Sequence, residues 1–230
     1  MLGITSSVGG AWCLIVAATA LLLIPSDAYA MDWSAQRYVQ NDAFRTEPSA
    51  ARKYPLARGA AKVYLLRGFL NVFSLGMDDL ASKLQADGVS ATVTNYADAD
   101  LVTSQIVTTY NAGDHGPVVL IGHSLGADAI VEVADALAQY NIPVSLLVLY
   151  DGTEPHQIPA NVATAINYTK HFMIAPGTGS RGVVSNVDLS GDPGIDHLSI
   201  DTAPALQSQT LNYVLQATSA VPREPASRRQ

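Results

Sequence analysis

The chain is poor in cysteine and in basic residues. Cys13 is its single cysteine, so no disulfide can form within the chain and the fold must be held by its core. Lys and Arg together number 13 against 20 Asp and Glu, and none of the 13 lies between Lys83 and Lys170. A chain with a net charge of -7 and such a gap offers no basic stripe to phosphate groups. The composition therefore argues against nucleic acid as a partner.

One long apolar run lies near the N-terminus. Residues 11–24, AWCLIVAATALLLI, have the length of the apolar region of a signal peptide, and PSDAYA follows with small residues at Ala28 and Ala30. This pattern predicts export with cleavage after Ala30, and hence an extracytoplasmic location, periplasmic or secreted. The alternative is an uncleaved membrane anchor over residues 8–25, although a span needs roughly 20 apolar residues and the segment before the run carries no Lys or Arg.

The rest of the chain has enough apolar material for one sizeable core but hardly for two. We expect four parts in chain order. A signal peptide or anchor occupies residues 1–30, and a lead-in segment without sustained periodicity occupies residues 31–60. A single folded domain covers residues 61–218. Residues 219–230 are polar with two prolines, which indicates a disordered tail.

Within the expected domain, short apolar runs alternate with segments of helical periodicity. Strands are predicted over KVYLLRG, ATVTNY, PVVLIG and VSLLVLY, and helices over GMDDLASKLQADG, residues 98–112 and about residues 125–140. Two further strands, NYTKHFMIA and GVVSNVDL, and a last helix, APALQSQTLNYVLQAT, follow. The alternation predicts an α/β fold in which helices flank both faces of a mostly parallel β-sheet. The glycosylation sequon at residues 167–169 falls in one of these strands, so we interpret it as coincidence.

The strand PVVLIG runs directly into GHSLG, where Ser124 lies between Gly122 and Gly126. The pattern G-x-S-x-G between a buried strand and a helix is typical of a nucleophile elbow, in which a sharp turn holds the serine hydroxyl out at the carboxyl edge of the sheet. The N–H of Leu125, at the start of the helix, would face an oxyanion formed there. Phe69, just after the first strand, is the expected second N–H donor.

A serine nucleophile needs a base, and the base needs an orienting group. His197 lies in the glycine-rich stretch GDPGIDHLSID after the last strand, where a loop can reach the carboxyl edge, and it is the expected base; His156 is the rival. Asp151 ends the strand VSLLVLY one strand away from the elbow and is the expected acid. Of the other histidines, His115 is expected in a polar turn and His171 within a strand. His123 is expected inside the elbow, with its side chain directed away from the serine.

The order Ser124, Asp151, His197 resembles that of the α/β-hydrolase superfamily, and its thioesterase and lipase-like members in particular. The resemblance covers roughly residues 61–218. It implies a serine hydrolase that cleaves ester or thioester bonds through an acyl-enzyme, without cofactor or metal, on a small-molecule or surface-presented acyl substrate. About fifteen residues separate Asp151 from the next predicted strand. That is room for one helix and a rim, so we expect a minimal fold without a lid domain.

Arg67 stands, in LLRGF, where this superfamily often has a histidine. It has two interpretations: a guanidinium that recognises a carboxylate or phosphate of the substrate, or one that pairs internally with Asp78 or Asp79. Two alternatives to hydrolysis also stay open, namely acyl transfer or amide cleavage on the same three residues, and a non-catalytic binding protein with a hydrolase fold. The sequence leaves open the acyl group, the leaving group and the oligomeric state.

Overall fold

The structure is a computed structural model that describes residues 60–69 and 74–219. By compactness the chain divides into Met1–Gln36 and Arg37–Gln230, and every described residue belongs to the second unit. The predicted signal segment or anchor, nearly all of the lead-in segment and nearly all of the tail therefore lie outside the described residues and stay predictions. Among the described residues, none of the helices has the length and apolarity that a membrane span requires.

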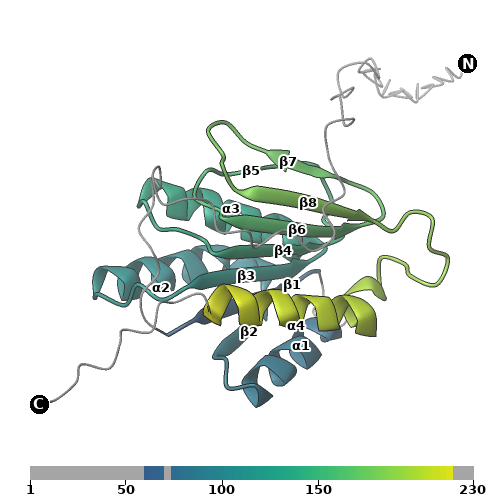
Figure 1. The fold of residues 1–230 in the computed structure, drawn as a ribbon, viewed down its shortest axis with the longest axis horizontal. Coiled ribbons are helices and arrows are strands. Elements are labelled where there is room, and N and C mark those ends of the chain that lie inside the picture. The colour runs from purple at the N-terminus through teal and green to yellow at the C-terminus, as the bar shows by residue number, and fades with distance from the viewer. Residues whose placement is uncertain (1–59, 70–73, 220–230) are drawn as a thin grey trace, which may run out of the picture. The chain divides into compact units, whose positions relative to one another are not determined.

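Six strands form one sheet, in the order β2-β1-β3-β4-β6-β8 (Figure 1). Every neighbouring pair in it is parallel. This confirms the predicted fold class. Five of these strands lie where an apolar run predicted one, whereas β6 begins at Thr164, three residues before the predicted strand NYTKHFMIA. In chain order the strands are β1 (Lys62–Arg67), β2 (Ala91–Asn95), β3 (Val118–His123), β4 (Leu146–Tyr150), β6 (Thr164–Thr169) and β8 (Val183–Asp188).

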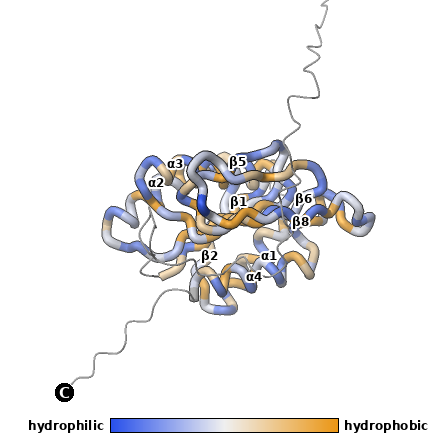
Figure 2. The backbone as a smooth tube through the Cα atoms, turned by 45° about the horizontal axis from the view of Figure 1, so that its top comes forward, coloured by the Kyte–Doolittle hydropathy of each residue, from blue (hydrophilic) through white to orange (hydrophobic). Residues whose placement is uncertain are grey.

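Helices cover both faces of the sheet, because consecutive parallel strands need a crossover connection. Helices α2 and α3 lie on one face, and α1 and α4 lie on the other (Figures 1 and 2). Their bounds are α1 (Leu75–Ala86), α2 (Ala99–Asn111), α3 (Leu125–Gln139) and α4 (Pro204–Ser219), with short 3-10 helices η4 (Tyr96–Asp98) and η5 (Ile200–Thr202) before α2 and α4.

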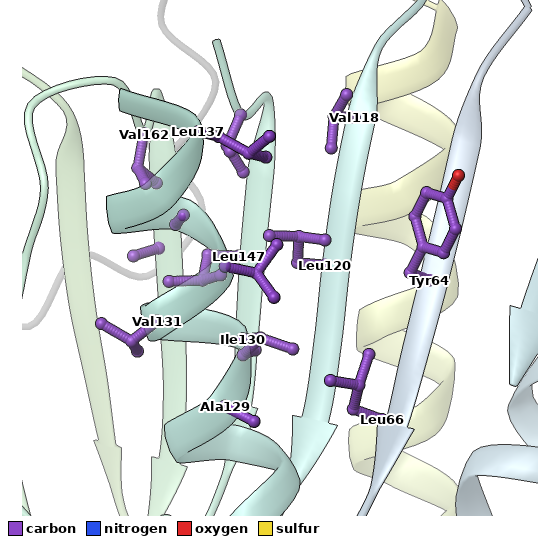
Figure 3. Close-up of a cluster of buried hydrophobic side chains, with 14 of the residues drawn as sticks. Tyr64, Leu66, Val118, Leu120, Ala129, Ile130, Val131, Leu137, Leu147 and Val162 are labelled. Atoms are coloured by element: carbon purple, nitrogen blue, oxygen red, sulfur yellow. The ribbon is translucent and has the colours of Figure 1, made fainter. Parts of the chain in front are cut away.

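Each face of the sheet has its own apolar core, since alternate side chains of a strand point to opposite faces. Leu66, Leu120 and Leu147 pack toward α3, where they meet Ile130 and Leu137 (Figure 3). The other core joins the sheet to α1 and α4 and includes Leu65, Ile121, Val148, Met77 and Leu80. All six residues of β3 are buried, which places the strand that leads to Ser124 at the centre of the domain.

The segment between β4 and β8 differs from the predicted one. NYTKHFMIA is not one strand, because β6 ends at Thr169 and β7 (Ile174–Pro176) begins after a turn. The Thr169 hydroxyl accepts the N–H groups of His171 and Phe172, at 3.0 Å each, and this ends the strand. The stretch after Asp151 supplies a strand, β5 (His156–Ile158), where we expected a loop or a helix, and β5 pairs with β7 in a separate two-stranded parallel sheet.

Candidate active site

Ser124 sits in a strained corner between β3 and α3. Its backbone has φ 57° and ψ -128°, a combination that costs energy for any residue with a Cβ. A Cβ at Gly122 would lie 2.1 Å from the carbonyl oxygen of Gly126, and a Cβ at Gly126 would lie 2.1 Å from that of Leu66. Both glycines are therefore needed for the close approach of α3 to β1 and β3, as an elbow at this position requires.

The structure brings Ser124, Asp151 and His197 together. The Ser124 Oγ lies 3.0 Å from the His197 Nε2, and the His197 Nδ1 lies 2.8 Å from the Asp151 Oδ2. Ser124 follows β3 and Asp151 follows β4, while His197 lies in the loop between β8 and η5. A carboxylate can only accept, so the Nδ1 of His197 carries a proton and, in the neutral imidazole, the Nε2 is free to accept the serine hydroxyl.

The electrostatic environment shifts the pKa values of Asp151 and His197 in opposite directions. Burial alone would raise the pKa of the fully buried Asp151, but hydrogen bonds from His197 and the Lys170 N–H, with the nearby His171, lower it to about 2. The hydrogen bond to Asp151 raises the pKa of His197, although partial burial opposes it. Asp151 is thus ionised at any working pH, and it stabilises a proton on His197.

The surroundings of the expected oxyanion donors are partly in place. Leu125 is the first residue of α3, so its N–H has no acceptor within the helix. Gly68 packs against Ser124 so closely that a Cβ there would lie 2.9 Å from the Ser124 Cβ and 3.4 Å from its Oγ. Phe69 follows Gly68 with a side chain that is 58% exposed. The segment that follows β1 therefore borders the serine. Donation of the Phe69 N–H to an oxyanion stays a prediction.

The remaining sequence candidates have other partners. The Nε2 of His156 lies 2.7 Å from the Asp128 Oδ1, so the rival base ties β5 to α3 and does not contact Ser124. Arg67 pairs with Asp78 through two hydrogen bonds, the internal ion pair that was one of its two interpretations.

Sequence reasoning missed His171, which it placed inside a strand. The His171 Nδ1 lies 3.0 Å from the Asp151 Oδ2, so two imidazoles share one carboxylate. The side chain of His171 is 55% exposed. Ligand atoms of Asp151, His171 and His197 all lie within 4.8 Å of one another, a spacing that could hold a metal ion, and hydrogen bonds to the shared carboxylate account for it equally well.

A hollow of about 460 Å³ adjoins the elbow. Leu125, the residue after the candidate nucleophile, is one of the residues that line it. Its rim is polar and acidic, and the residues that contribute to it include Tyr96, Asp100, Asp128, Glu132, Thr153 and Glu154.

A scan of protein-family models and a comparison with curated protein sequences returned no match. Among solved structures, the chain is similar to a cutinase-like protein from Cryptococcus sp., at 17% identity over 70% of this chain and 96% of the other, with a TM-score of 0.46. It is also similar to a protein from Xanthomonas campestris described as a hydrolase of the alpha/beta superfamily, at 17% identity over 71% of this chain and 100% of the other, with a TM-score of 0.41. A third similar structure is an acetyl xylan esterase, at 14% identity over 70% of this chain and 100% of the other, with a TM-score of 0.42.

Proposed function

We propose that this protein is a serine hydrolase that cleaves ester or thioester bonds through an acyl-enzyme. The observation that carries the proposal is the unbroken path from the Ser124 Oγ to the His197 Nε2 at 3.0 Å and from the His197 Nδ1 to the Asp151 Oδ2 at 2.8 Å. A strained elbow holds the nucleophile, and a fully buried carboxylate fixes the tautomer of the base. Such a set activates a hydroxyl that is otherwise a poor nucleophile.

In the proposed reaction the Ser124 Oγ attacks the acyl carbonyl carbon while His197 takes the hydroxyl proton. The negative charge on the carbonyl oxygen faces the N–H of Leu125, with that of Phe69 as the expected second donor. The imidazolium then returns the proton to the leaving alcohol or thiol as the bond to it breaks, which leaves the acyl group on Ser124. A water molecule, deprotonated by His197, attacks the acyl-enzyme and releases the carboxylic acid and the free serine.

The proposed substrate is a small or surface-presented acyl ester or thioester. Within the described residues, the segment between Asp151 and β6 holds only the short strand β5, so it forms no lid over the serine. The hollow beside Leu125 is open to solvent at a polar rim. These features support access by substrates that do not need to be engulfed.

Replacement of the nucleophile tests the proposal directly. We expect Ser124→Ala to lower kcat by roughly 10⁴ to 10⁶ fold on p-nitrophenyl esters, as loss of a triad serine does elsewhere. The same variant should lose covalent labelling by a fluorophosphonate probe, which reacts with activated serines. Ser82→Ala, at an exposed position on α1, is the matched control and should keep both.

Three outcomes would change the assignment. Near-normal turnover in Ser124→Ala would overturn it, and absence of labelling in the wild-type chain would favour a non-catalytic binding protein with this fold. Labelling without ester turnover, followed by product formation once an alcohol or amine acceptor is added, would favour acyl transfer on the same three residues.

We further propose, from the sequence pattern alone, that residues 1–30 direct export and are then removed. N-terminal sequencing of the exported chain should give Met31 as the first residue, whereas retention of the full N-terminus in a membrane fraction would favour an anchor.

A further inference from the structure

A buried histidine lies immediately before the nucleophile in the chain. His123 is the last residue of β3, immediately before Ser124, and its side chain is 1% exposed. Burial lowers the pKa of His123 to about 4, although its hydrogen bond to the His197 backbone opposes the shift. The imidazole is therefore neutral at neutral pH, and no step of the proposed reaction uses it.

The contacts of His123 fix the direction of every hydrogen bond around it. Its Nε2 lies 2.8 Å from the backbone carbonyl oxygen of His197, which can only accept, so the Nε2 carries the proton. The Nδ1 of the neutral ring is then an acceptor, and the Ser74 hydroxyl, 2.8 Å away, donates to it. The Ser74 oxygen in turn accepts the N–H of Gly68 at 3.0 Å.

These bonds join the two segments that must meet at the serine. One end of the path is the backbone of His197, the base. The other end is Gly68, which precedes the expected oxyanion donor Phe69. Gly68 lies so close to the nucleophile that a Cβ added to it would be 2.9 Å from the Ser124 Cβ. We propose that His123 and Ser74 are a pair of positioning residues, which hold the base His197 and the oxyanion segment at Gly68 in place around Ser124. This inference rests on the proposed function.

The contacts of the base loop support a specific role for His123. The Lys170 Nζ holds this loop through the carbonyl oxygens of Leu189, Asp192 and Ile195, all upstream of the base. His123 alone, among the hydrogen bonds of the described side chains, contacts the carbonyl of His197 itself. Removing the Nε2 donor should therefore let the imidazole of His197 shift while the remainder of the loop stays in place.

One further ionisable group faces His123. The Asp201 Oδ2 lies 3.9 Å from the His123 Nδ1, beyond hydrogen-bond range, and accepts the Gly76 N–H at 3.0 Å. Burial raises the pKa of Asp201 to about 6. The ring of His197, the other neighbour, lies 5.2 Å from that of His123 between centroids and is tilted by 38° relative to it. The Ser74 hydroxyl thus remains the only hydrogen-bond partner of the Nδ1 within the described residues.

The experiment replaces one half of the imidazole at a time. The side-chain amide of Gln can place an N–H where the His123 Nε2–H is, and the amide of Asn can place an oxygen where the Nδ1 is. His123→Gln keeps the bond to His197 and loses the one to Ser74, whereas His123→Asn does the opposite. We expect His123→Asn to lower kcat by about 10 to 100 fold with KM nearly unchanged, because displacement of a catalytic group by about 1 Å can cost 10²-fold. His123→Gln should stay within several-fold of the wild type.

Proton NMR supplies a readout that a structural role alone would not move. The downfield resonance of the His197 Nδ1–H bound to Asp151 should persist in His123→Gln and shift or broaden in His123→Asn. Ser74→Ala, which frees the Gly68 N–H, should lower kcat while this resonance stays in place. Both His123 variants should show comparable free energies of unfolding in urea.

Equal kcat values for the Asn and Gln variants at comparable stability, or loss of activity in step with the folded fraction, would overturn the positioning role. Such a result is distinguishable from failure of the proposed function, in which Ser124→Ala and the wild type would have equal turnover.

Discussion

At the scale of single residues, one carboxylate controls the behaviour of the candidate base. Asp151 accepts from His197, His171 and the Lys170 N–H, and its backbone also has a positive φ, 48°. A residue in that backbone region costs energy unless its surroundings hold it there. The strain at Asp151, like that at Ser124, falls on a group whose position the proposed chemistry depends on.

The raised pKa of His197 gives a pH prediction. The imidazole accepts the serine proton only when neutral, so kcat/KM should rise with pH and level off above an apparent pKa higher than the usual 6.5. Asp151 stays ionised throughout this range, since its pKa is about 2. Asp151→Asn should shift the apparent pKa downward and lower kcat by about 10⁴ fold, because the wrong tautomer then faces the serine.

The control for this prediction is Asp192→Asn, an exposed acid of the same loop region whose Oδ1 only accepts the Gly194 N–H. Its pH profile should match that of the wild type, measured as kcat/KM on a neutral ester between about pH 5 and 9, a range that contains the ordinary histidine pKa and extends well above it. An unchanged profile in Asp151→Asn would remove the acid from the mechanism.

At the scale of elements, the elbow depends on how closely α3 approaches the sheet. Gly122→Ala would place a Cβ 2.1 Å from the Gly126 carbonyl oxygen, a backbone atom that moves only if α3 moves. We expect a loss of about 1–3 kcal/mol in the free energy of unfolding, the usual cost of forcing extra volume into a packed interior. Urea denaturation followed by circular dichroism measures it.

Gly191→Ala is the matched glycine control, because a Cβ there meets nothing within 4 Å. Its free energy of unfolding should stay within about 0.5 kcal/mol of the wild type. If Gly122→Ala were as stable as Gly191→Ala, the close approach of α3 would not be a requirement of the fold.

The elements that the sequence predicted well are those with continuous apolar patterns. The run VVLIGH is buried along its whole length as β3, and the segment after Ser124 is apolar enough to predict α3 within a residue of its end. β5 and β7 have three residues each, too few to show a period, and the turn at Thr169 depends on one hydroxyl. A threonine before Lys-His was the only local signal for that turn.

The same reasoning applies to the candidate site. Strand ends predict which residues share an edge of a parallel sheet, so Ser124 and Asp151 could be placed from the pattern alone. His171 and the His123 to Ser74 path could not, because they join segments far apart in the chain through side-chain geometry that leaves no periodic trace. Ser74 lies 49 positions from His123.

At the scale of the whole molecule, the described chain leaves the serine edge without a lid. The segment after Asp151, where an insertion could cover the site, turns instead into β5 and pairs with β7. We therefore expect kcat/KM on p-nitrophenyl esters to be highest for short acyl chains and to fall as the chain lengthens, since an open site buries little of a long one. Thioesters of the same acyl series would then identify the preferred leaving group.

A preference confined to long acyl chains would contradict the open site. Ser124→Ala serves as the blank for each ester, so that uncatalysed hydrolysis is subtracted at every chain length.

The sequon at residues 167–169 has a practical consequence. Asn167 is 1% exposed, and its Nδ2 donates to the Phe172 carbonyl and to the Asn186 Oδ1, both at 2.9 Å. A sugar attached to this nitrogen before folding would have to occupy the buried space in which the amide contacts Phe172 and Asn186. We expect a eukaryotic secretory host that glycosylates nascent chains to yield misfolded protein. We also expect Asn167→Gln to lose stability, because the longer side chain displaces the amide from the Phe172 carbonyl and the Asn186 Oδ1. A bacterial host is the sounder source of this protein.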